Sequence, residues 1–307
     1  MGQVVSFNDK ESGPSAEGDS ALRLSKLRVS VAGHELAYST LGQGSPIVFV
    51  HGNYLSSRMW RHIIPALSKY GRCIAIDLPG FGASDSLNGI AGCNTHIQQQ
   101  RFLFDGFLRA LDVDSDVTLV GHGIGSLLAC DWAFKNKQKV KAIAYTHGIF
   151  ADTSRLVGGA DLEQLRTPET LAYMLESPDL LEEIISSFFY KPLSQRELSA
   201  YSQRLYDDAE APVTVGNWIR DLPCWGVPEE AQRIVAEYSN WMRASDLPKL
   251  WIRSSMKTLE YQNSYDLIAE TFPQQRQVNM KGGYVLQEDS PRQFARILKV
   301  WLAAQVA

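Results

Sequence analysis

Leu119-Val120-Gly121-His122-Gly123-Ile124-Gly125-Ser126 has the spacing of a turn in which a strand passes sharply into a helix. In this G-x-nucleophile-x-G pattern, the middle residue is lifted above the sheet as a reactive side chain. Gly121 and Gly125 occupy the two glycine positions, but Gly123 stands where serine, cysteine or aspartate is expected. Either the frame of the pattern is displaced, or the chain keeps this fold and does something other than covalent hydrolysis.

Short apolar runs alternate with helical patterns on both sides of this stretch. Two antiparallel strands are predicted at 27–31 and 35–38, and strands buried on both faces at 47–50, 72–77, 117–120 and 142–145. Helices are predicted between them at 59–70, 97–111 and 124–136. Four amphipathic helices without a strand follow at 162–174, 178–189, 194–206 and 229–244. The alternation then resumes with a strand at 249–253, a helix at 261–272, a strand at 276–280 and a helix at 291–304.

This order predicts an α/β fold with a mostly parallel, twisted sheet flanked by helices and interrupted by a helical cap. We expect a flexible leader at residues 1–22, a core made of 23–150 and 246–307, and a cap at 151–245.

Composition narrows the classes of partner. The net charge of −4 shows no basic surplus for a nucleic acid, and no apolar run is long enough to form a transmembrane segment. The 4 cysteines are widely spaced and lack metal-ligand spacing, so they are interpreted as reduced intracellular thiols, and a cytoplasmic location is expected. We expect no metal and no cofactor. Met1-Gly2-Gln3-Val4-Val5-Ser6 fits an acylation pattern, which leaves a weak lipid anchor at Gly2 as an alternative to a chance match.

Several stretches in the right order resemble one family of enzymes. Val50-His51-Gly52-Asn53-Tyr54 and the residues to Pro65 resemble the loop after the third strand of haloalkane dehalogenases and coelenterazine luciferases. Further matches lie at 76–85, 218–223, 243–249 and 286–289. The resemblance implies the α/β-hydrolase fold.

The family's catalytic residues are not found at the matching positions. Where the family has H-D-W-G at the turn, this chain has Gly123 and Ile124 in place of the nucleophile and the halide-binding tryptophan. Tyr284 stands at the position of the catalytic histidine, before Leu286-Gln287-Glu288-Asp289. The two positions used by the family for the supporting acid hold His147 and Lys257. All three members of the triad are therefore replaced.

The remaining polar residues define the candidate site. His147 and Tyr284 are the catalytic candidates, because imidazole and phenol exchange or donate protons; the alternative is that they fill space in the core. The resemblance implies that Asn53 points into the pocket as a donor, and that the amides near Asn53 and Ile124 form the former oxyanion hole. Gly123 either enlarges the pocket floor or records simple loss of the nucleophile. Trp218 is the last candidate for substrate binding, and the alternative is that it only packs in the core or cap. His51 and His122 are interpreted as structural residues.

Two functions from different classes follow. The first is a non-hydrolytic enzyme for a small, apolar, carbonyl-bearing metabolite, which promotes isomerisation, cyclisation or elimination in specialised metabolism. The second is an inactive hydrolase homologue that binds a small molecule or a partner protein. A hydrolase or dehalogenase with an unrecognised nucleophile is a minor third. The oligomeric state is left open.

Overall fold

An eight-stranded sheet forms the centre of the molecule in the computed structural model, which describes residues 24–87, 89–151, 166–223, 226–255, 266 and 268–305. The strand order is β1-β2-β4-β3-β5-β6-β7-β8. β1 and β2 pair antiparallel, β2 runs antiparallel to β4, and the other neighbours are parallel. The strands are β1 (Leu27–Val31), β2 (His34–Leu41), β3 (Pro46–Val50), β4 (Arg72–Ile76), β5 (Val117–His122), β6 (Val140–Thr146), β7 (Lys249–Ser254) and β8 (Gln275–Met280).

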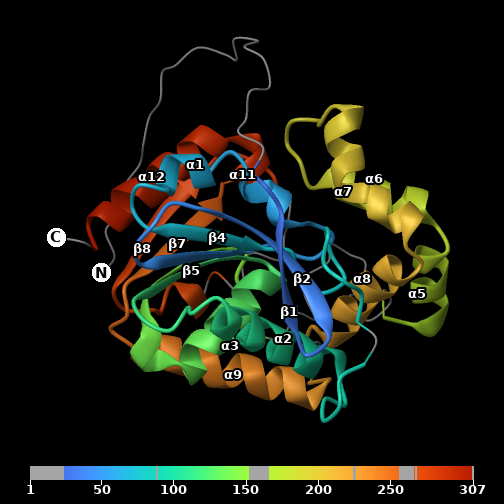
Figure 1. Cartoon of the computed structure of the whole chain (residues 1–307), viewed down its shortest axis with the longest axis horizontal. Helices are drawn as coiled ribbons and strands as arrows, with labels where there is room; N and C mark the ends of the chain where they lie inside the picture. Colours follow the sequence, from blue (N-terminus) through green and yellow to red (C-terminus); the bar gives the residue numbers. More distant parts are fainter. Residues whose placement is uncertain are drawn as a thin grey trace.

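Helices cover both faces of this sheet (Figure 1). α1 (Ile64–Leu67), α11 (Leu286–Asp289) and α12 (Pro291–Ala303) lie on one side, and α2 (His96–Ala110), α3 (Ile124–Lys135) and α9 (Glu229–Ala244) lie on the other. The mostly parallel α/β fold predicted from the alternating pattern is confirmed.

The tight packing of α3 against the central strands depends on Gly121 and Gly125. A side-chain carbon at Gly121 would lie 2.6 Å from the Cα atom of Ser126, and one at Gly125 would lie 2.6 Å from the carbonyl carbon of Val50. Only a residue without Cβ permits such a close approach between strand and helix. The two glycines of the pattern therefore hold the turn from β5 into α3 directly above the sheet.

Four helices that follow β6 in the chain lie at one side of the sheet (Figure 1). They are α5 (Pro168–Leu175), α6 (Pro178–Ser187), α7 (Gln195–Asp207) and α8 (Glu210–Asp221). We call these four helices the cap helices. α9 follows them and packs against α3. The hydroxyl of Ser239 on α9 donates to the carbonyl of Phe150 at 3.0 Å. The domain limits given above stay predictions, and α9 is the part of the predicted 151–245 cap that lies on the sheet domain.

Two local differences from the sequence expectation concern proline. The helix expected at 59–70 is divided into a 3-10 turn, η1 (Ser57–Trp60), and the short α1, which carries Pro65 in its first turn. The structure also has a helix, α8, that the sequence pattern does not predict. Pro212 is tolerated there because it lies in the first turn, where a missing N–H costs no intrahelical bond. A second 3-10 turn, η2 (Lys137–Lys139), precedes β6.

Some expectations concern residues outside the described ranges. These are the leader with Gly2, most of the helix at 261–272, and Lys257. Acylation at Gly2 and a cytoplasmic location stay predictions. Within the residues that the structure describes, no helix is both long and apolar enough to cross a membrane.

Lys249 is an unusual member of the core at the start of β7. Its side chain is fully buried, and its Nζ donates to the carbonyl oxygens of Ser245 at 2.6 Å, Leu247 at 2.9 Å and Pro273 at 3.0 Å. Burial lowers the pKa of Lys249 to about 8, so the amine is still mostly protonated at pH 7. Three acceptors match the three N–H donors of an ammonium group.

Replacing Lys249 by Met is expected to reduce the free energy of unfolding by about 2 kcal/mol, because buried carbonyls lose their donor. Urea unfolding at pH 7 measures the effect. Lys299→Met, at an exposed position of α12, is the control and is expected to change the free energy by less than about 0.5 kcal/mol. Equal stabilities of the two variants would show that the three hydrogen bonds do not stabilise the fold.

Candidate functional site

The turn between β5 and α3 has the backbone geometry expected of a residue that is lifted above a sheet. Gly123 adopts φ 53° and ψ −122°, and its amide donates to the carbonyl of Thr146 on β6 at 3.2 Å. This region of backbone space is rare for residues with a Cβ. Ile124 is the first residue of α3, where amide groups lack a partner within the helix and point out of its N-terminus.

Tyr284 occupies the space directly above Gly123. A side-chain carbon built on Gly123 would lie 2.7 Å from the hydroxyl oxygen of Tyr284, 3.7 Å from the Cα atom of Gly52 and 3.8 Å from Cζ of Tyr284. The phenol oxygen therefore lies where the first atom of a nucleophilic side chain would need room. The structure brings Gly123, Ile124 and Tyr284 together at the end of β5.

Two histidines complete this group. The ring of Tyr284 lies 4.4 Å from the ring of His147 and 4.6 Å from that of His122, measured between centroids. The two imidazoles are 5.5 Å apart and meet edge to face. His122 Nε2 lies 3.0 Å from the carbonyl oxygen of Tyr284, and because a carbonyl only accepts, Nε2 carries the proton. We call His122, His147 and Tyr284 the ring cluster.

Both imidazoles of the ring cluster are neutral at pH 7. Burial, followed by the nearby His122, lowers the pKa of His147 to about 3. Burial lowers the pKa of His122 to about 4, against the opposing effect of its hydrogen bond to Tyr284. Desolvation penalises the charged form of an imidazole, which explains the direction of both shifts. The two side chains therefore act as uncharged hydrogen-bonding groups over the ordinary pH range.

Aromatic rings continue from the ring cluster to the cap helices. Phe188, at the C-terminal end of α6, lies 5.0 Å from Tyr284 and 5.5 Å from Tyr54, between ring centroids. Burial raises the pKa of the Tyr54 phenol far above its usual value, so this group also stays neutral. We call Tyr54, Phe188 and Tyr284 the aromatic wall.

Asn53 and Trp218 both take part in contacts of α8. The amide nitrogen of Asn53 donates to the carbonyl of Val215 at 3.3 Å, and its side-chain oxygen accepts from the amide of Tyr54 at 3.1 Å. Trp218 is fully buried, and its ring meets His96 of α2 edge to face at 5.1 Å. Its indole Nε1 has no hydrogen-bond partner among the described residues. The structure thus places the side-chain amide of Asn53 against α8 and Trp218 in the contact between α8 and α2.

Three participants in the site were not among the sequence candidates. His122, interpreted as structural, is fully buried and holds the carbonyl of Tyr284. Its position next to Gly123 was the available signal. Phe188 lies in no motif, and the packing of α6 on the core brings it to Tyr284. Tyr54 lies in the loop after β3 that resembles the family, and its ring contacts that of Phe188. No group of three side chains suited to a metal ion occurs in the described ranges.

The chain is similar in sequence and fold to known proteins. The model of the alpha/beta hydrolase family matches residues 47–297. A haloalkane dehalogenase of Sphingobium indicum is 32% identical over 275 residues, which cover 87% of this chain and 91% of the relative. The coelenterazine h 2-monooxygenase of Renilla reniformis is 29% identical over 261 residues, 82% of each chain. The crystal structure of haloalkane dehalogenase DbeA from Bradyrhizobium elkani superposes with a TM-score of 0.83 at 26% identity, covering 92% of this chain and 98% of the other.

Proposed function

This chain belongs to the alpha/beta hydrolase family, and we propose that it is a member that converts an uncharged, carbonyl-bearing small molecule without covalent attack from the turn above β5. The reaction classes proposed are isomerisation, cyclisation and elimination, in a pathway of specialised metabolism. Each of these rearranges a substrate that hydrogen bonds and shape hold in place, and none requires an enzyme nucleophile.

The position of the Tyr284 hydroxyl is the observation that carries this proposal. It lies 2.7 Å from the point where a Cβ on Gly123 would begin, so the space of the nucleophile is taken by a hydrogen-bond donor. The nearest hydroxyl along α3, that of Ser126, is buried and donates to the carbonyl of Thr146 at 3.2 Å. Nucleophilic catalysis needs a heteroatom beside a base that activates it, and Gly123 offers none.

The groups around Gly123 favour a neutral, ring-bearing ligand. A substrate carbonyl above the turn would accept from the Tyr284 hydroxyl and from the amide of Ile124, which is the arrangement that stabilises a developing oxyanion. The aromatic wall offers ring faces for stacking. The low pKa values of His122 and His147 keep both imidazoles uncharged at pH 7, so they offer no counter-ion to an anionic ligand. Neutral His147 orients the substrate or Tyr284 by hydrogen bonding.

The relatives support an enzyme and do not impose hydrolysis. The relative from Sphingobium indicum is a haloalkane dehalogenase, whereas the relative from Renilla reniformis is a monooxygenase. A chain of this family can therefore have a reaction other than hydrolysis. A hydrolase or dehalogenase with a nucleophile other than Gly123, the minor third function expected from the sequence, becomes the second candidate because the dehalogenase relatives favour it.

We expect the purified protein to release no halide from 1-bromobutane, to resist labelling by a fluorophosphonate, and to convert at least one member of a panel of uncharged aryl ketones and enones. Tyr284→Phe is expected to lower that conversion about a hundredfold, because an oxyanion donor is lost. Mass spectrometry of the panel measures conversion. Tyr206→Phe, at an exposed hydroxyl of α7, is the matched control and leaves the rate unchanged.

Halide release or a covalent adduct would overturn the proposal in favour of a hydrolase. A compound that binds and is recovered unchanged would instead indicate a small-molecule binding protein, the other function expected from the sequence.

A further inference from the structure

The loop that carries Tyr284 is attached to the cap helices as well as to the sheet. It runs from the end of β8 to α11 and places Gly283 and Tyr284 against the segment that follows α6. We propose that this loop and the segment 188–191 move as one body, and that Asp289 is the residue that positions Tyr284 above Gly123. The inference concerns the site described above and rests on the proposed role of Tyr284.

Asp289 joins the two segments through its carboxylate. Its Oδ1 accepts from the backbone amides of Tyr190 at 2.9 Å and Lys191 at 3.1 Å, and its Oδ2 accepts from the amide of Gly283 at 2.6 Å. The carboxylate is almost fully buried, with 3% of the residue exposed. Lys191 adds a bond from Nζ to the carbonyl of Asp289 at 3.2 Å. Bonds from backbone amides to an ionised acceptor are among the stronger hydrogen bonds in proteins.

The backbone of Phe188 makes a second connection next to the first. Its carbonyl accepts from the amides of Tyr284 at 2.9 Å and Val285 at 3.2 Å, while its ring packs on the ring of Tyr284. A Cβ on Gly283 would lie 2.6 Å from the carbonyl oxygen of Phe188 and 2.9 Å from the amide nitrogen of Tyr190. The two segments are therefore in direct backbone contact, and only glycine fits between them. A shift of the segment after α6 must shift the amide of Tyr284.

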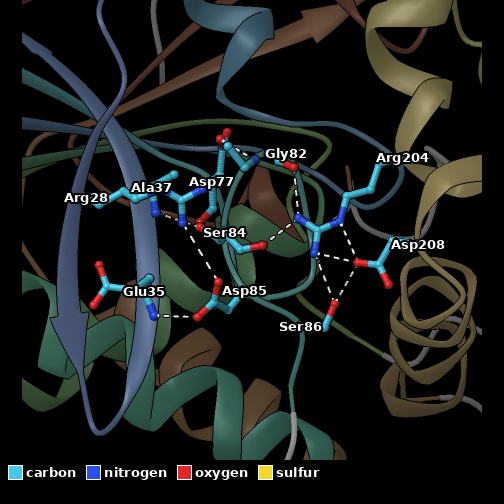
Figure 2. A network of polar contacts seen from close by, with 11 residues as sticks. Arg28, Glu35, Ala37, Asp77, Gly82, Ser84, Asp85, Ser86, Arg204 and Asp208 are labelled. Atoms are coloured by element: carbon cyan, nitrogen blue, oxygen red, sulfur yellow. Dashed lines mark hydrogen bonds and ion pairs between the residues drawn. The ribbon is translucent and has the colours of Figure 1, made fainter.

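The cap helices have another polar attachment, which does not involve Tyr284. Figure 2 shows Arg204 of α7 reaching the loop after β4, where it donates to the carbonyl of Gly82 at 2.8 Å and to the hydroxyl of Ser86 at 3.0 Å. Arg204 is also paired with Asp208, the residue that follows α7, at 2.9 Å. The loop after β4 is anchored in turn on β2, because the amide of Ala37 donates to Ser84 at 2.8 Å. Loss of Arg204 thus loosens the cap helices without touching the loop of Tyr284.

The two attachments have different consequences. Movement at the Asp289 attachment withdraws the phenol oxygen from Gly123 and opens the floor of the site, so ligand entry and placement of the donor are one event. The Arg204 attachment holds α7 to the loop after β4, and none of its hydrogen bonds involves the loop of Tyr284. The function of the cap helices at this site is therefore to set the position of Tyr284, in addition to covering the ligand.

The test compares Asp289→Asn with Arg204→Gln in the full chain. In Asp289→Asn the new side-chain nitrogen has to face either Gly283 or the amides of Tyr190 and Lys191, and a donor then opposes a donor. The readout is the signal of Tyr284 in protein labelled with 13Cζ-tyrosine, assigned with Tyr284→Phe. We expect Asp289→Asn to shift or broaden that signal and Arg204→Gln to leave it at its wild-type position. Conversion of the best panel compound should fall about tenfold or more in Asp289→Asn only, since small misplacements of a donor have large effects on rate.

The same signal in Asp289→Asn and wild type, or an equal shift in Arg204→Gln, would overturn the inference. If Asp289→Asn does not fold, Gly283→Ala tests the same contact from the other segment, because its Cβ pushes against Phe188. The spectroscopic readout needs no turnover. Absence of conversion in the wild type would therefore contradict the proposed function and leave the positioning of Tyr284 to be decided by the spectra.

Discussion

Lowering the pH from 7.5 to 5.5 is expected to reduce the free energy of unfolding by a net of about 3 kcal/mol, because three buried histidines take up protons only when the chain unfolds and Asp266 offsets part of their effect. The pKa values of His51 and His122 are lowered from 6.5 to about 4, and that of His147 to about 3, with burial as the largest cause. In this pH window the unfolded chain binds more protons than the folded chain, so stability falls as the pH falls. Each histidine accounts for about 1.4 kcal/mol between these two pH values.

Asp266 opposes this effect in part. Burial raises its pKa to about 6, so the folded state takes up a proton there and gains about 1 kcal/mol over the same window. Urea unfolding at pH 7.5, 6.5 and 5.5 measures the net slope. His147→Gln and His122→Gln are each expected to remove about a third of the histidine contribution. Slopes in both variants that equal the wild-type slope would show that these imidazoles are not held neutral.

Gly123→Ala is expected to reduce the free energy of unfolding by about 4 kcal/mol in the wild type and by only about 2 kcal/mol in a Tyr284→Phe background. The new Cβ meets the Tyr284 hydroxyl at 2.7 Å, whereas without that oxygen its nearest ring atom is Cζ at 3.8 Å. The phenol cannot swing aside easily, because His122, His147 and Phe188 pack around its ring. The part that remains in the double variant is the backbone strain of φ 53°.

A double-mutant cycle by urea unfolding isolates the steric part of this effect. Gly33→Ala is the matched control, since Gly33 also has a positive φ of 83° and has open space where its Cβ would be. Its cost should be that of the backbone alone and should not change in the Tyr284→Phe background. If Tyr284→Phe left the cost of Gly123→Ala unaltered, the phenol oxygen would not be the atom that occupies the site.

The sequence predicts the sheet well because its strands are short apolar runs between helical patterns. The runs at 47–50 and 117–120 lie within β3 and β5, which are buried on both faces. The sequence does not predict whether a proline ends a helix or is accommodated in its first turn. Pro65 divides an expected helix, whereas Pro212 is accommodated in the first turn of α8.

The sequence predicts only part of the candidate site. Gly123, Ile124 and Tyr284 lie in motifs whose frame can be checked on both sides, and the structure brings them together. The contact of Phe188 with Tyr284 joins residues that are far apart in the sequence, and it depends on how α6 is placed over the sheet. No local pattern specifies that placement. The partner of a motif residue is therefore harder to predict than the motif itself.

The phenol above Gly123 also bears on the evolution of this chain. A nucleophile at position 123 has no room while Tyr284 is present, and a histidine at position 284 has no nucleophile to activate while Gly123 is present. A nucleophile introduced alone at position 123 is therefore expected to destabilise the protein, and a histidine introduced alone at position 284 is expected to add no activity. The two positions are therefore coupled, and under the proposed function a change to covalent attack from position 123 needs at least these two substitutions together.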